Sequence, residues 1–198
     1  MHIVLVEYPG YSIYNTDKDA DKLQDDALIV YDYLTNELNV DTNNIYIYGR
    51  SIGTGPALFI CSKRKPAGLI LMSPFTSIQA VAEVRVGKLL KFLISERFIN
   101  IEYIKHVTCP ILFIHGQQDT LIPFSHTIKL KQECTCPYEV ILPENMDHDV
   151  INNKEDLITP MENFLLKHTD YTFDDEYYNF SIPEFLHDVP KYIKNKFN

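Results

Sequence analysis

The segment Ile45-Tyr46-Ile47-Tyr48-Gly49-Arg50-Ser51-Ile52-Gly53-Thr54-Gly55 decides how the rest of this sequence is interpreted. An apolar, aromatic run leads directly into the pattern G-x-S-x-G. Between a strand and a helix, this pattern is typical of a nucleophile elbow, a sharp turn that exposes a serine hydroxyl and needs small residues where a Cβ would clash. We therefore expect Ser51 to be a nucleophile, with the Ile52 amide facing a developing oxyanion. A glycine-rich turn that only packs a helix on a strand, or binds phosphate, is the alternative.

Short apolar runs recur along the chain and alternate with stretches that carry apolar residues at three- and four-residue spacing. This alternation is typical of strand–helix–strand units around a parallel sheet. Runs that are apolar almost throughout indicate strands covered on both faces. We predict an α/β fold, a three-layer sandwich with a mostly parallel sheet of about five strands. The strands are expected at residues 3–8, 45–48, 68–72, 111–115 and 138–142.

The stretches between these runs predict helices at residues 20–38, 55–61, 125–133 and 154–167. The connection over 74–108 is longer than a crossover needs, and its apolar part, 89–94, fits either a lid over an acyl group or a surface helix. Beyond 168 the composition becomes acidic and aromatic. We expect one domain over 1–168 and a tail over 169–198, with one short helix near 182–193.

Composition excludes several classes of protein. The net charge of −9 repels nucleic acid, which is not expected as a partner. The four cysteines fit neither a zinc knuckle nor a Cys-x-x-Cys redox motif, and free thiols in a reducing compartment are expected. The sequence contains neither an apolar run long enough to span a bilayer nor a secretory signal. By its own residues the chain is expected to be cytoplasmic.

A serine nucleophile requires a histidine base and a carboxylate that orients it. Asp119 follows the run at 111–115, and His148 follows the run at 138–142. Because the carboxyl ends of parallel strands meet at one edge of a sheet, both side chains are expected beside Ser51. Asp119 is interpreted as the acid, the alternative being an ordinary turn aspartate, and His148 as the base.

Other residues compete for these roles. His115 is the strongest rival base, but it adjoins Asp119 and would leave no catalytic group after the last strand. His126 opens a helix and is expected to be a cap or a surface residue. Asp147 and Asp149 flank His148 and are expected to be solvated, because a sequence neighbour seldom folds back onto an imidazole in the required geometry.

Several segments resemble α/β hydrolases, and more narrowly the group of α/β-hydrolase domain-containing protein 17. They are EYPGYS at 7–12, YGRSIGTGP at 48–56, SPF at 73–75, CPILFIHG at 109–116 with Asp119, and DH at 147–148. The resemblance covers about residues 4–166. It implies a serine esterase or thioesterase, and group members are depalmitoylases that remove S-acyl groups from protein cysteines. Carried over, the roles are Ser51 nucleophile, His148 base, Asp119 acid and Ile52 oxyanion amide.

The resemblance also implies parts that this sequence does not contain. The family has strands ahead of the EYPGY segment, and a His-Gly loop among them donates a second oxyanion amide. The chain starts after that loop, so we expect an N-terminally truncated fold. Either the family's first strands are absent from this sequence, or the run at 3–8 pairs directly with the strand that precedes Ser51. Losing one oxyanion donor costs on the order of 10²- to 10³-fold in turnover, which predicts slow catalysis. A cysteine-rich anchor, as in the relatives, would add peripheral membrane contact to a longer form.

We interpret the sequence as a hydrolase of a small ester or an S-acylated protein that uses an acyl-enzyme on Ser51. Phe75 and Ile122, at strand ends, are expected to contact the acyl chain. The mechanism requires no metal and no organic cofactor. Two alternatives remain: a serine peptidase of prolyl-oligopeptidase type, and a non-catalytic interaction protein that uses the same fold as a scaffold. The sequence does not indicate an oligomeric state.

Overall fold

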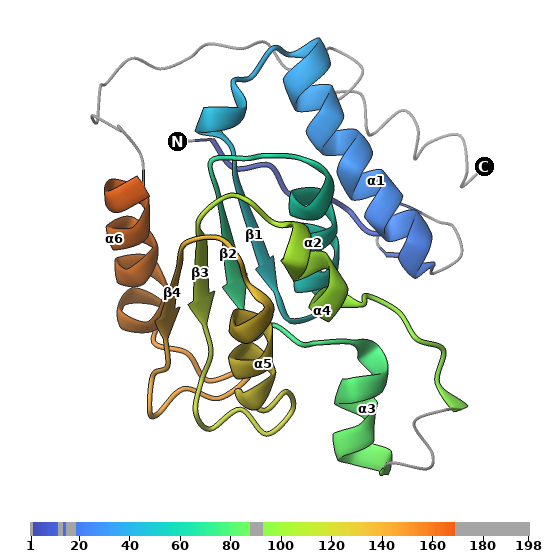
Figure 1. The fold of residues 1–198 in the computed structure, drawn as a ribbon, viewed down its shortest axis with the longest axis vertical. Helices are drawn as coiled ribbons and strands as arrows, with labels where there is room; N and C mark the ends of the chain where they lie inside the picture. The colour runs from blue at the N-terminus through green and yellow to red at the C-terminus, as the bar shows by residue number, and fades with distance from the viewer. Residues whose placement is uncertain (1, 12–13, 15–18, 88–92, 169–198) are drawn as a thin grey trace, which may run out of the picture. The chain divides into compact units, whose positions relative to one another are not determined.

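The computed structural model describes residues 2–11, 14, 19–87 and 93–168, and its centre is a parallel sheet in the order β1-β2-β3-β4. The strands are β1 Tyr46–Arg50, β2 Gly68–Met72, β3 Ile111–Ile114 and β4 Tyr138–Ile141. Tyr46 pairs with Gly68, Leu69 with Ile111, and Ile111 with Tyr138. All four strands therefore end at the same edge of the sheet (Figure 1).

Helices connect the strands and cover the sheet on both faces, which confirms the predicted α/β architecture (Figure 1). The α-helices are α1 Ala20–Asp32, α2 Thr54–Lys63, α3 Ile78–Val86, α4 Asn100–Tyr103, α5 Ser125–Glu133 and α6 Thr159–His168. Shorter turns are η1 Tyr33–Glu37, η2 Thr42–Asn44, η3 Ser51–Gly53, η5 Ile104–His106 and η6 Asn153–Ile158. The predicted helix over 20–38 forms as α1 followed by the π-helical turn η1.

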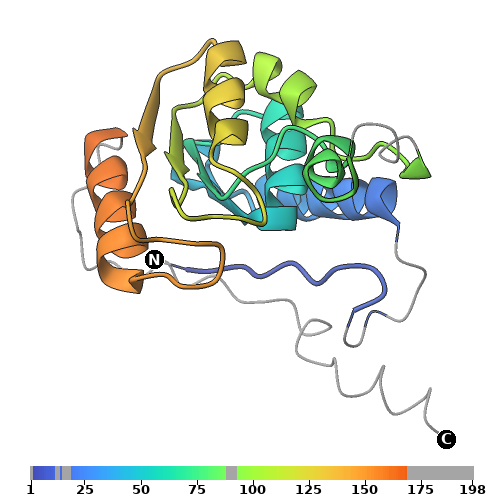
Figure 2. The same cartoon turned by 90° about the horizontal axis from the view of Figure 1, so that it is seen from below.

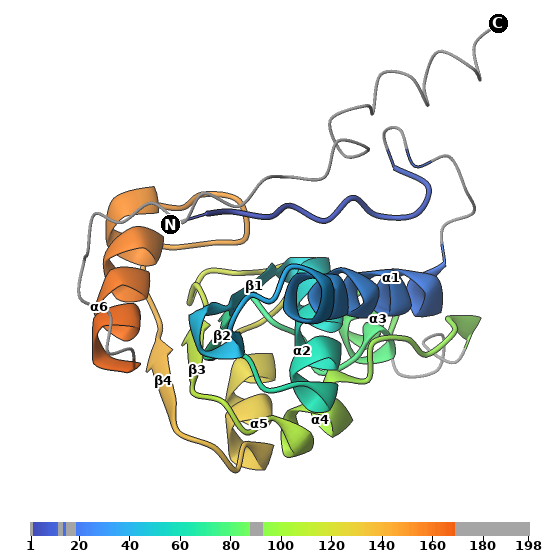
Figure 3. The same ribbon diagram turned by 90° about the horizontal axis from the view of Figure 1, so that it is seen from above.

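The two faces of β2 and β3 are both buried, which explains why these strands are apolar throughout. Leu71 and Phe113 point to one face, where α2 and α5 pack, and Met72 and Ile114 point to the other, where Phe164 of α6 packs. Figure 2 shows β4 between α5 and α6, and Figure 3 shows α2, α4 and α5 together on one side of the sheet. Each such buried side chain stabilises the fold by about 1.5–3 kcal/mol.

The strand predicted over 3–8 does not form. Residues 2–11 belong to a unit separate from the compact unit Ala20–Tyr171, and they contain a turn closed by the Tyr11 amide on the Tyr8 carbonyl. Ile3 and Leu5 are 73% and 89% exposed. An apolar run becomes a strand only where a neighbouring backbone accepts its hydrogen bonds, and the run itself does not determine that neighbour.

Some predictions lie outside the described residues, namely the tail over 169–198 with its short helix and most of the apolar stretch at 89–94. Leu93, which is described, is 82% exposed.

Within the described part of the chain, no helix has the length and apolar character needed to cross a membrane.

Candidate active site

Ser51 lies in a sharp turn between β1 and α2. Its φ is 51°, in the left-handed region that residues with a Cβ seldom occupy. The turn is tight: a Cβ on Gly49 would lie 2.5 Å from the Gly53 carbonyl oxygen. Thr54 Oγ1 donates a hydrogen bond of 2.7 Å to the Ser51 carbonyl as α2 begins. The structure therefore has the strand-to-helix turn that the glycine spacing predicts.

Three side chains from three loops form a chain of hydrogen bonds beside this turn. His148 Nε2 lies 3.0 Å from Ser51 Oγ, and His148 Nδ1 lies 2.8 Å from Asp119 Oδ2. Asp119 and His148 are buried, and Ser51 is half-buried. With Nδ1–H donated to the carboxylate, Nε2 keeps the lone pair that accepts the Ser51 hydroxyl hydrogen. The structure thus brings together the three residues that the sequence singles out.

The Asp119 carboxylate is held by donors on both oxygens. Oδ1 accepts from the amides of Leu121 at 3.0 Å and Ile122 at 2.7 Å. Burial by itself would raise the pKa of Asp119, but hydrogen bonds from His115, the Ile122 amide and His148 outweigh it and hold that pKa well below the usual range. Asp119 is therefore ionised at neutral pH and favours the Nδ1–H tautomer of His148.

Main-chain contacts join the loops that follow β3 and β4. The Gln118 amide donates to the Met146 carbonyl at 3.0 Å, and a Cβ on Gly116 would collide with that same carbonyl. Only glycine allows the two backbones to approach this closely. The contact brings Asp119 within reach of His148.

Arg50, to which the sequence assigns no role, connects β1 to the His148 loop. Its Nη2 donates to the His148 carbonyl at 2.5 Å and lies 3.3 Å from Asp149 Oδ1. The Asp149 side chain is 86% exposed, so the ion pair is screened by water and contributes little. The bond to the carbonyl is therefore the one that positions His148. The sequence signals Arg50 only by its place inside the G-x-S-x-G pattern.

The rival residues occupy supporting positions. His115 is fully buried, with Nδ1 2.7 Å from Thr127 Oγ1 and Nε2 2.7 Å from the Ile122 carbonyl. Its Nε2 also lies 3.5 Å from Asp119 Oδ2, so His115 helps to hold the Asp119 carboxylate in place. Asp147 Oδ1 accepts hydrogen bonds from the amides of Asp149 and Val150, both at 2.7 Å, and so caps a turn.

His126 is not the cap or surface residue that its place at the start of α5 suggests. It is 4% exposed, and its Nδ1 accepts from the Thr76 amide at 3.3 Å and lies 3.0 Å from Thr76 Oγ1. The expectation is wrong because the loop after β2, which carries Phe75, folds over the start of α5. His126 ties that loop to the helix.

An apolar cavity of about 140 Å³ opens beside the Ser51 hydroxyl. Phe75 and Ile122, the two residues expected to contact an acyl chain, both line it. The complete lining is Ser51, Ile52, Phe75, Ile78, Val81, Leu121 and Ile122. Ile52 also lies in the first turn after the strand, where backbone amides have no intrahelical acceptor, so its N–H is available to an oxyanion.

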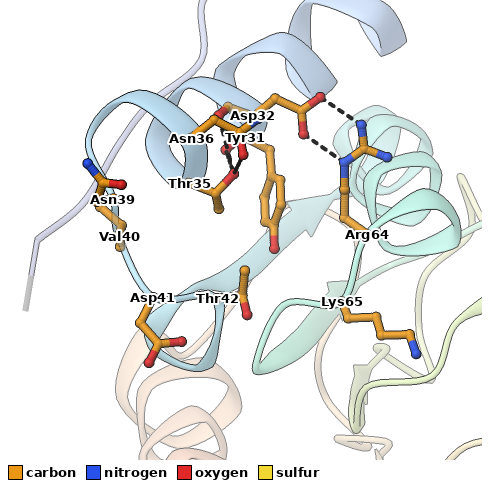
Figure 4. A pocket seen from close by; sticks show the side chains of 10 residues that line it. All are labelled: Tyr31, Asp32, Thr35, Asn36, Asn39, Val40, Asp41, Thr42, Arg64 and Lys65. Carbon is orange, nitrogen blue, oxygen red and sulfur yellow. Dashed lines mark hydrogen bonds and ion pairs between the residues drawn. The ribbon is translucent and has the colours of Figure 1, made fainter.

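A second, larger cavity of about 550 Å³ lies between η1 and the end of α2 (Figure 4). Arg64 and Asp32 form a two-bond ion pair across its wall, with both N–O distances at 2.7 Å. Its other lining residues are Tyr31, Thr35, Asn36, Asn39, Val40, Asp41, Thr42 and Lys65. Because this lining pairs no nucleophile with a base, the smaller cavity beside Ser51 is the candidate active site.

Comparisons with known proteins place the chain in a family. No family model matches it. It is 32% identical over 148 residues to human α/β-hydrolase domain-containing protein 17B, covering 75% of this chain and 50% of the relative. It is 30% identical over 164 residues to protein 17C of Xenopus tropicalis, covering 83% and 52%. The chain thus spans about half the length of the curated relatives it matches.

Solved structures with the same fold include an acetyl xylan esterase and a monoacylglycerol lipase. Acetyl xylan esterase from Paenibacillus sp. R4 has a TM-score of 0.61 at 18% identity, over 74% of this chain and 52% of that one. Monoacylglycerol lipase of Paleococcus ferrophilus has a TM-score of 0.56 at 14% identity, over 74% and 76%. The chain belongs to the α/β-hydrolase superfamily, because it is at least 30% identical to proteins 17B and 17C over 75% or more of its length. Within that superfamily it resembles the domain-containing protein 17 group.

His126 is expected to make the fold sensitive to mild acid. Burial, with the charge of Lys129, lowers its pKa to about 4 from 6.5. Between these values the unfolded chain binds more protons, so stability falls as pH falls. Urea unfolding should show wild type losing about 2 kcal/mol more than His126→Asn between about pH 7 and about pH 5, because the asparagine keeps an acceptor for Thr76 without titrating. Equal losses in the two proteins would contradict this assignment.

Proposed function

We propose that this chain hydrolyses carboxylic esters or thioesters through an acyl-enzyme on Ser51. The observation that carries the proposal is the hydrogen-bonded chain from Asp119 through His148 to Ser51, which ends at an apolar cavity. A serine hydroxyl is a weak nucleophile unless a base accepts its proton as it attacks. His148 is placed to accept that proton, and Asp119 is placed to stabilise the imidazolium that results.

The reaction proceeds in two halves. His148 Nε2 takes the Ser51 proton while Oγ attacks the carbonyl carbon, and the carbonyl electron pair moves onto the oxygen near the Ile52 amide. Collapse of this intermediate expels the alcohol or thiol, which leaves with the proton from His148. Water then gives a proton to His148 and attacks the acyl carbon, and the carboxylic acid is released as Ser51 regains its proton.

The cavity favours a short acyl group. Its volume of about 140 Å³ resembles that of an engineered apolar cavity that binds benzene, so a group of a few carbons fits inside. The S-acylated protein substrates that the family resemblance implies would carry a longer chain, part of which would extend out of the cavity. A series of p-nitrophenyl esters and S-acyl peptides of increasing acyl length would separate a short-chain esterase from a depalmitoylase.

Replacing Ser51 is expected to abolish hydrolysis of a short p-nitrophenyl ester. Ser51→Ala removes the attacking oxygen and should lower kcat/KM by at least about 10³-fold, the scale seen when a serine nucleophile is removed. Ser125→Ala is the matched control, because Ser125 is exposed at the start of α5 and should leave the rate unchanged. Equal rates for Ser51→Ala and wild type would refute the proposal.

Removing the Arg50 guanidinium is expected to slow the chemical step. Arg50→Gln loses the charged donor to the His148 carbonyl, a bond worth about 1.5–3 kcal/mol, so kcat should fall about 10- to 100-fold with little change in KM. Arg64→Gln is the control, because Arg64 pairs with Asp32 at the other cavity. If both variants lose the same activity, Arg50 does not position the base.

A further inference from the structure

Two of the four cysteines form a close pair in the connection between α5 and β4. Cys134 Sγ lies 3.3 Å from Cys136 Sγ and 3.5 Å from the Cys136 carbonyl oxygen. Both side chains are partly exposed, whereas Cys61 and Cys109 are buried. The pair precedes β4, so it lies at the amino-terminal edge of the parallel sheet. Ser51 follows β1 at the opposite edge, and the proposed reaction does not use these thiols.

The backbone on either side of the pair is anchored. The Cys134 amide donates to the Lys131 carbonyl at the end of α5, and the Pro137 carbonyl accepts from the Ile111 amide of β3 at 3.0 Å. These bonds fix where the helix ends and the strand begins. The turn between them holds the two sulfur atoms together, and bonding distance requires them to approach by only about a further 1.2 Å.

The two thiols also differ in acidity. Such a difference is needed when one thiol attacks an oxidant and the other then closes a disulfide with it. The hydrogen bond from Cys136 lowers the pKa of Cys134 to about 7, and the same bond raises the pKa of Cys136. The hydrogen bond between the two sulfur atoms therefore favours the thiolate form of Cys134 and the protonated form of Cys136. The thiolate is the form that attacks peroxides, and exposure gives the oxidant access.

We propose that Cys134 and Cys136 are an oxidation site that closes to an intramolecular disulfide when it meets a peroxide. The Cys134 thiolate attacks one peroxide oxygen, the O–O bond breaks, and the sulfur becomes a sulfenic acid as hydroxide leaves. The Cys136 sulfur then attacks the Cys134 sulfur, and the departing hydroxide takes the Cys136 proton as water. Two sulfur atoms are oxidised, one peroxide is reduced, and a dithiol reductant reverses the change.

A metal centre, another common use of clustered cysteines, does not fit this site. No group of three or more metal-ligating side chains in the described ranges is arranged to hold a metal ion, which argues against a soft-metal centre. The second pair, Cys61 and Cys109, is also hydrogen-bonded, but burial raises the pKa of Cys61 well above its usual value. The hydrogen bond from Cys61 lowers the pKa of Cys109, but both side chains are buried and out of reach of an oxidant, so this second pair is an internal control.

The test is oxidation of the reduced 198-residue chain by hydrogen peroxide at neutral pH, followed by alkylation, intact mass and peptide mapping. Wild type should lose two hydrogen atoms, with the disulfide mapped to the peptide that contains Cys134 and Cys136, and dithiothreitol should restore both thiols. Cys134→Ser and Cys136→Ser should each abolish the disulfide. Cys61→Ala, which breaks the buried pair, should retain it. Circular dichroism checks that all variants are folded.

Rates give a second readout that does not depend on any variant. Iodoacetamide should alkylate Cys134 in reduced wild type at least about tenfold faster than Cys61 or Cys109. The inference is overturned if peroxide leaves Cys134 and Cys136 as free thiols, if the disulfide maps to the buried pair, or if oxidation yields only disulfides between chains. None of these outcomes depends on whether Ser51 is catalytic, because no step involves the active site.

Discussion

The backbone turn at Ser51 is the constraint on which the rest of the site depends. Holding a residue with a Cβ in the left-handed region costs roughly 1–2 kcal/mol, so the turn persists only because its surroundings fix it. Gly49 is paired with Leu71 in the sheet, and α2 begins at Thr54. Between these two fixed points the chain must reverse sharply. A relaxed turn would move the hydroxyl away from His148 Nε2, which now lies 3.0 Å away.

The remaining geometry is set mainly by contacts to the main chain. The Gln118 amide donates to the Met146 carbonyl, and the Arg50 guanidinium, at the end of β1, donates to the His148 carbonyl. Asp119 is held by amides of its own loop, and its pKa is low because His115, the Ile122 amide and His148 all donate hydrogen bonds to its carboxylate. Three loops are thereby fixed to one another without contacts to substrate. Such preorganisation lets the proposed base and acid act without rearrangement.

The sequence predicts the parts of the fold and site that follow from local pattern. β1 to β4 were predictable because strands buried on both faces are apolar runs, and Ser51 and His148 were placed because each follows such a run. The prediction of a strand over 3–8 was wrong, because strand pairing depends on backbone that lies far away in the sequence. The roles of Arg50 and His126 were missed because each binds a backbone group brought by tertiary folding, which residue type does not reveal.

The proposed reaction requires that His148 makes Ser51 nucleophilic. Its most direct test is labelling with a fluorophosphonate, which reacts with an activated serine, followed by peptide mapping of the adduct. One adduct is expected, on Ser51, with a labelling rate at least about 10³-fold lower in His148→Ala. Absence of an adduct, an adduct on another serine, or labelling of Ser51 at the same rate in His148→Ala would contradict it.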